Sequence, residues 1–228
     1  MTTLIPVFMA IAYAFAMYRI SVWRSAKTLN ENSHPLREPE ITAMAQRLAR
    51  ALDLTSIQVH VYAVDPVNGL AAPDGRIFLT EGFLRKYRAG EVTAAELASV
   101  IAHELGHVAL GHTRRRMIDV TGANAVFMMA SALLSRFLPI IGIWLANLLS
   151  TALMARISRK DEFEADAYAS ALLVKAGIGT AAQKSLFRKL DALVGHRGTT
   201  APEWLLSHPR TPDRIAAIEA NEARWNLG

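Results

Sequence analysis

The segment His103-Glu104-Leu105-Gly106-His107 constrains this chain more than any other part of its sequence. Two histidines four positions apart lie on one face of a helix, where both imidazoles can bind one zinc ion and the intervening glutamate lies beside the water that the metal holds. A capping box from Thr93 to Glu96 precedes the segment, and apolar residues continue at helical spacing. The sequence therefore predicts that His103 and His107 lie on a helix.

A third ligand is expected from the acidic run between Asp161 and Asp166, the only dense carboxylate cluster after this segment. Glu162 and Asp166 are four residues apart and share a helix face, whereas Glu164 faces away. The spacing predicts a His-His-Glu zinc site, with Glu162 as the third protein ligand and Asp166 orienting a ligand histidine. The alternative is a solvated acidic start of a helix, because acidic residues also favour a first turn.

The residues after His107 exclude one class of zinc peptidase. A metzincin requires glycine at position 110 and histidine at position 113, where this chain has Leu110 and Thr113. His112 lies five residues after His107, and at about 100° per residue its side chain points well away from the ligand face. We therefore expect His112 to be a polar residue near a helix C-terminus.

The histidine pair, a hydrophobic insert and the segment from Ser158 to Asp166 follow one another along the chain. This order resembles the integral-membrane gluzincins of the HtpX and CAAX prenyl protease type, metallopeptidase family forty-eight. Asn68-Gly69-Leu70-Ala71 is similar to the family's Asn-Ala-aromatic-Ala element, from which its second and third residues depart. His208-Pro209 followed by Arg214-Ile215 is similar to the family's C-terminal His-Pro and Arg element. The resemblance covers roughly residues 40 to 220.

The resemblance implies an α+β, predominantly helical fold: a gluzincin-like zinc peptidase domain with a small antiparallel sheet. Alternating apolar residues predict one strand around residues 57–63, and a second runs from Arg76 to Thr80. In the family this second strand borders the cleft and pairs with extended substrate, so its edge is the expected docking site for a peptide.

The expected activity is that of a membrane-anchored, zinc-dependent endopeptidase with one Zn²⁺ per subunit. Zinc would lower the pKa of its water, and Glu104 would act as general base. By resemblance, His208 or Arg214 would stabilise the oxyanion. The substrate would be a polypeptide, either a membrane protein under quality control or a prenylated peptide. The alternative is a non-catalytic membrane adaptor or chaperone-like binding module on the same scaffold.

The first segment of the chain is expected to be a membrane anchor. Residues Leu4 to Tyr18 are uncharged, and the apolar run reaches Trp23 if Arg19 snorkels, which gives about 20 residues and one span. A cleaved signal peptide is the alternative, but there is no basic n-region and basic residues follow the segment. The same basic residues predict that the C-terminal side of the segment, with the catalytic domain, faces the cytoplasm. The expected location is a bacterial inner membrane. We expect an anchor at 1–26, a linker at 27–39 and a peptidase domain at 40–228.

A hydrophobic insert at 120–155 lies inside the peptidase domain, and Arg136 is the only charge between Thr121 and Ala155. The insert must begin and end on one side of a membrane, because the segments before and after it are expected to bind the same zinc. Two full crossings need about 40 residues plus a turn, so a short, partly inserted hairpin with Ser135-Arg136 near its tip is predicted. A buried helix pair in a soluble domain is the alternative.

The composition agrees with a membrane partner. Hydrophobic residues make up 52% of the chain, and the formal net charge is only +5. Basic residues cluster beside apolar segments, which favours a lipid bilayer over nucleic acid as the anionic partner. The chain has no cysteine, so a zinc site has only histidine and carboxylate side chains available as ligands.

Overall fold

The computed structural model describes residues 4–72, 74–112, 115, 127–129, 131, 133, 136, 141–195 and 211–225. The helices that it defines are α1 Leu4–Glu31, α2 Pro39–Ala51, α3 Glu81–Arg88, α4 Ala94–Ala109, α6 Ile141–Lys175, α7 Ala181–Gly195 and α9 Thr211–Arg224. The strands are β1 Ser33–Pro35, β2 Val59–Tyr62, β3 Gly69–Ala71 and β4 Ile77–Thr80. The fold is therefore α+β and predominantly helical, as the sequence predicts.

The four strands form one sheet in the order β1-β2-β4-β3. β1 pairs antiparallel with β2 and β3 pairs antiparallel with β4, but β2 and β4 run parallel. The expected antiparallel sheet is therefore a mixed sheet, because the β3-β4 hairpin inserts β4 between β3 and β2. The expectation that the Arg76 to Thr80 strand offers a free edge is also wrong, since β4 pairs on both sides. β3 is the edge strand next to β4.

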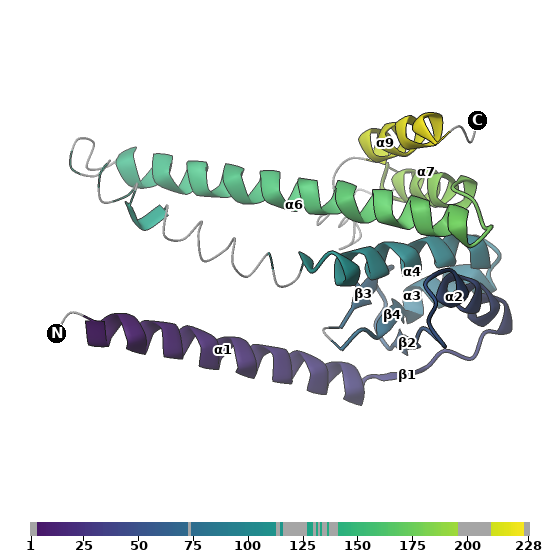
Figure 1. The fold of residues 1–228 in the computed structure, drawn as a ribbon, viewed down its shortest axis with the longest axis horizontal. Helices are drawn as coiled ribbons and strands as arrows, with labels where there is room; N and C mark the ends of the chain where they lie inside the picture. The colour runs from purple at the N-terminus through teal and green to yellow at the C-terminus, as the bar shows by residue number, and fades with distance from the viewer. Residues whose placement is uncertain are drawn as a thin grey trace.

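α4 is the central helix of the domain (Figure 1). It contacts α6 and α7, and it also contacts α2, β3 and β4. The capping box predicted at its start is present, because Thr93 accepts from the backbone N–H of Glu96 and the Glu96 side chain accepts from the backbone N–H of Thr93. This position between helices and sheet explains why α4 is almost entirely buried from Ala94 to Gly106.

The segment expected to be a linker at 27–39 is structured. α1 continues to Glu31, and β1 follows with Ser33 paired to Tyr62 of β2. Polar residues and proline favour a loop locally, but pairing with β2 supplies backbone hydrogen bonds that the local sequence does not reveal. The division of the chain into anchor, linker and peptidase domain stays a prediction.

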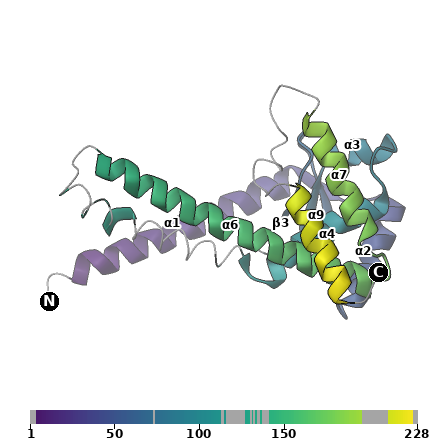
Figure 2. The same cartoon turned by 90° about the horizontal axis from the view of Figure 1, so that it is seen from above.

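α1 and the first half of α6 project from the domain in the same direction (Figures 1 and 2). α6 runs without interruption from Ile141, inside the expected insert, through the acidic segment to Lys175. Among the described residues, α6 is the one helix long and apolar enough to cross a membrane by length and composition. Ser135 of the predicted hairpin tip, with most of 113–140, lies outside the described residues, so the hairpin stays a prediction.

Candidate metal centre

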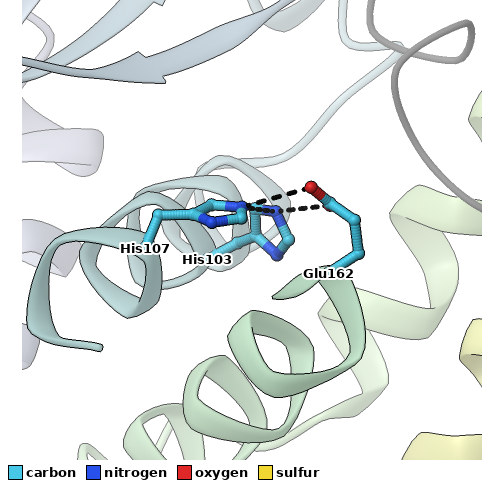
Figure 3. Close-up of side chains that lie close together, drawn as sticks. All are labelled: His103, His107 and Glu162. Carbon is cyan, nitrogen blue, oxygen red and sulfur yellow. Dashed lines mark hydrogen bonds and ion pairs between the residues drawn. The ribbon is translucent and has the colours of Figure 1, made fainter. Parts of the chain in front are cut away.

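Three side chains from two helices converge on one point (Figure 3). His103 and His107 come from α4, and Glu162 comes from α6. The Nε2 atoms of the two histidines lie 3.1 Å apart, and the Glu162 carboxylate oxygens lie 3.3 Å from His103 Nε2 and 3.5 Å from His107 Nε2. The structure therefore brings together the three residues that the spacing singled out.

Close contact between α4 and α6 allows this convergence. Gly106 faces the backbone of Ala165, and a Cβ atom at Gly106 would lie 3.0 Å from the Ala165 carbonyl oxygen and 3.3 Å from Tyr168 Cβ. Two small residues thus let the helix backbones approach. Glu162 lies one turn before Ala165, within reach of both histidines.

His103 is oriented by a buried ion pair. Its Nδ1 lies 2.9 Å from Asp166 Oδ1, and Asp166 is held in turn by Arg214 of α9 through Nε and Nη2, each at 2.6 Å. The Arg214 guanidinium also stacks 4.2 Å above the Phe187 ring, and only 1% of this residue is exposed. The bidentate pair fixes the Asp166 carboxylate, which can then accept the Nδ1 proton of His103 and leave Nε2 as a metal ligand.

The position of the His112 side chain differs from the one expected from the sequence. Its ring is 1% exposed, and its Nδ1 lies 2.8 Å from Nδ1 of His107. The expectation that it points away assumed a continuous helix, but α4 ends at Ala109 and Gly111 has a positive φ of 65°. The left-handed conformation of Gly111 changes the chain direction after the helix, and the His112 imidazole then lies against His107. A glycine immediately before a histidine was the available sequence signal.

Glu104 lies beside the converging ligands and is 6% exposed. Burial raises the pKa of its carboxyl to about 7, opposed by the nearby His103 and by a hydrogen bond from the Ala71 backbone. A carboxylate with a pKa near neutrality can accept a proton and release it again, which suits a general base. Ala71 belongs to β3, so this edge strand lies directly beside the catalytic glutamate proposed from the sequence.

The three converging groups suit a divalent metal. With His103 Nδ1–H directed to Asp166 and His107 Nδ1–H directed to His112, both Nε2 lone pairs and a carboxylate point at the same small volume. In the neutral tautomers this arrangement is repulsive unless a cation lies among the three groups, either a proton on an imidazole or a metal ion. Ligands arranged tetrahedrally at zinc distances of about 2.0 to 2.1 Å lie about 3.4 Å from one another, close to the separations observed.

The structure describes one of the two residues expected to contact the oxyanion, Arg214, but not the other, His208. Arg214 is buried and paired with Asp166, as described above, and its Nη2 also lies 3.5 Å from His103 Nδ1. His208 lies outside the described residues. The sequence placed Arg214 near the site by resemblance, but its bidentate pairing with Asp166 depends on how α9 packs against α6.

The sequence profile of peptidase family M48 matches residues 35–222. The chain belongs to this family. It is 30% identical to metalloprotease LoiP of Escherichia coli over 78% of this chain and 68% of that protein. It is 29% identical to a protease HtpX homolog of Acaryochloris marina over 79% of this chain and 71% of that protein.

The chain is also 29% identical to the mitochondrial metalloendopeptidase OMA1 of Schizosaccharomyces pombe, over 71% of this chain but 45% of that longer protein. Family and relatives agree that the chain is a metalloendopeptidase, which confirms the reaction class expected from the sequence. The resemblance to family forty-eight is confirmed with it.

Proposed function

We propose that this chain is a membrane-anchored zinc endopeptidase in which His103, His107 and Glu162 hold one Zn²⁺. The observation that carries the proposal is the convergence of these three ligand groups beside the buried Glu104. The second candidate, a non-catalytic adaptor, has less support, because the family and the relatives of this chain are metalloproteases and because the three ligand groups and Glu104 are all present.

Zinc bound there supplies a Lewis acid that lowers the pKa of water and polarises the scissile carbonyl. Glu104 takes a proton from the attacking water at its carboxylate and gives it to the departing amine. Asp166 and Arg214 hold His103 in the tautomer that presents its Nε2 lone pair. Because Arg214 is committed to Asp166, we assign contact with the oxyanion to His208.

The edge of β3 is the proposed docking site for the substrate backbone. β3 pairs with β4 on one side only, and the backbone of Ala71 in the same strand lies close enough to Glu104 to affect its pKa. A peptide that pairs with this edge in an extended conformation would pass along the site with its backbone ordered. This places the docking strand one position outward from the β4 edge expected from the sequence.

The two projecting helices support a membrane location. The first half of α6 and the described part of α1 expose large apolar side chains, among them Tyr13, Phe15, Trp23, Ile143, Trp144 and Leu148. Trp144 is 76% exposed, which is costly for an aromatic ring in water but favourable at a bilayer interface.

The part of α6 before Arg156 is about 22 Å long at 1.5 Å per residue. Although α6 as a whole is long and apolar enough for a span by length and composition, this apolar part would enter a hydrocarbon core of about 30 Å without crossing it, because charged residues follow from Arg156 onward. We propose that α1 is the anchor and that residues 120–155 insert partly, at a bacterial inner membrane, with the catalytic domain in the cytoplasm. As the resemblance to the HtpX type implies, the proposed substrates are membrane proteins under quality control.

The experiment that tests this function compares the wild-type chain with Glu104→Gln. The variant should bind one zinc per chain with unchanged affinity but cleave a labelled unfolded protein about 10² to 10⁴ times more slowly, because an amide cannot accept the proton of water. Zinc content is measured by elemental analysis and cleavage by gel. Glu91→Gln, at an exposed carboxylate that pairs with Lys86, is the matched control and should retain full activity.

Two outcomes would contradict the proposal. Full cleavage by zinc-loaded Glu104→Gln would require another base. No cleavage by the zinc-loaded wild type, tested against soluble and membrane-inserted polypeptides, would favour the adaptor.

A further inference from the structure

His112 connects the candidate ligand His107 to a charged cluster. Its Nδ1 lies 2.8 Å from Nδ1 of His107, and its Nε2 lies 3.2 Å from Oε2 of Glu164. Arg115 donates to the same Glu164 oxygen at 2.8 Å and lies 3.4 Å from Asp161 Oδ1. His112 is fully enclosed, so its ring has a single environment.

Metal binding decides the direction of these hydrogen bonds. A neutral His107 that binds metal through Nε2 carries its proton on Nδ1. The proton points at Nδ1 of His112, which must then be the acceptor because two N–H groups cannot share one hydrogen bond. His112 consequently carries its own proton on Nε2 and donates it to Glu164. The Arg115 guanidinium balances the charge of that carboxylate.

We propose that His112 is a positioning residue that fixes the tautomer and ring orientation of His107 for metal binding. The inference rests on the proposed zinc site. Metal-bound histidines commonly donate their second N–H to a carboxylate, a carbonyl or water. His103 follows that rule through Asp166, whereas His107 uses a neutral imidazole supported by Glu164 and Arg115. The two ligand histidines therefore have unlike partners.

A second metal ion is the competing interpretation of this cluster, because His112, Asp161 and Glu164 also bring three possible ligand atoms together. Two features oppose it. His112 Nε2 carries a proton whenever His107 binds metal through Nε2, so it has no lone pair to offer. Arg115 already places a cation 2.8 Å from Glu164. The cluster is better explained as the support for His112.

The test compares His112→Leu with His112→Asn in the full chain, purified in detergent. Leucine fills the cavity but accepts no hydrogen bond, whereas the asparagine side-chain oxygen can take the place of Nδ1 as acceptor. His112→Leu should weaken zinc binding about 10-fold to 100-fold in competition with a chromophoric chelator, and His112→Asn should recover most of that loss. His34→Leu, at an exposed histidine of β1, is the control and should bind as the wild type does.

Two further readouts separate positioning from general stability. The visible spectrum of the Co²⁺-loaded protein reports ligand geometry, and it should change in His112→Leu but stay close to wild type in His112→Asn. Glu164→Ala should weaken zinc binding less than His112→Leu does. It should add nothing in the His112→Leu background, since it acts through His112.

The inference would be overturned if His112→Leu bound zinc with wild-type affinity and an unchanged Co²⁺ spectrum. Equal losses in the Leu and Asn variants would also overturn it, because an acceptor at Nδ1 would then have no effect. A wild-type chain that binds no zinc would refute the proposed metal site and this inference together. One zinc per wild-type chain with an unaffected His112→Leu variant would refute the inference alone.

Discussion

Individual residues set the protonation of the candidate centre. Burial lowers the pKa of His103, but hydrogen bonds with Asp166 and Glu162 outweigh it and raise the pKa to about 9. Without metal, His103 is therefore protonated at neutral pH and its Nε2 points a proton at Glu162. A metal must displace that proton, because only the neutral imidazole is a ligand.

Zinc affinity should consequently increase as the pH rises toward 9. Each pH unit below the pKa of His103 should weaken apparent binding about tenfold, since one proton competes with the metal. Competition titrations between pH 6.5 and 8.5 measure this slope. Asp166→Asn is the informative comparison, because loss of the carboxylate lowers the pKa of His103 and should flatten the slope. An affinity for zinc that is independent of pH in the wild-type chain would contradict the prediction.

At the scale of the elements, the α4–α6 contact decides whether the ligands meet. Gly106 lies in this contact, and the nearest atom that a Cβ there would meet is the Ala165 carbonyl oxygen, a backbone atom that cannot move away on its own. α9 also holds α6 in position through the ion pair between Arg214 and Asp166. The metal centre therefore depends on how three helices pack, although its residues come from two.

Gly106→Ala tests this contact, because the substitution either stabilises or destabilises the fold depending on whether the two helices are in close contact. Helix propensity alone would stabilise the alanine variant by about 1 kcal/mol. The added methyl group instead meets the Ala165 backbone, so we expect a net loss of about 1 to 3 kcal/mol in the free energy of unfolding. Zinc affinity should fall as well, because a displacement of α6 would move Glu162 away from His103 and His107. Urea unfolding of the metal-free protein provides the measurement, and a more stable variant would show that the helices are not in close contact here.

At the scale of the whole molecule, the projecting parts of α1 and α6 extend from the domain in one direction (Figures 1 and 2). A single membrane could accommodate both if the domain lay against its surface. Basic residues near the base of each projection, Arg24 and Lys27 on α1 and Arg156 and Arg159 on α6, agree with that orientation.

Single cysteines in this cysteine-free chain test the topology. Cysteines at Ser25 and Ser158 should react with an impermeant maleimide from the same side of the membrane, because both positions lie at the base of the projections. A cysteine at Thr2 should react from the opposite side if α1 crosses once. Labelling of intact and opened vesicles measures this. Reaction of Thr2 from the same side as the other two would show that α1 lies on the surface.

The sequence by itself determined whatever depends on short spacing. Local periodicity predicts that His103 and His107 share one helix face and that Glu162 and Asp166 share another. It also predicts the capping box at Thr93 and much of the helical content. The same short motifs carried the resemblance to the family, which the family profile confirms. These features need no knowledge of how distant segments meet.

Only the tertiary structure decided the rest. β4 became a central strand because a hairpin inserted it between two others, and strand order is not encoded in alternation. The segment around Ser33 became a strand because β2 supplied its backbone partners. His112 returned to His107 because Gly111 ended the helical periodicity. Arg214 became the partner of Asp166 because α9 packs on α6, since contacts between residues far apart in the sequence depend on packing that no local pattern records.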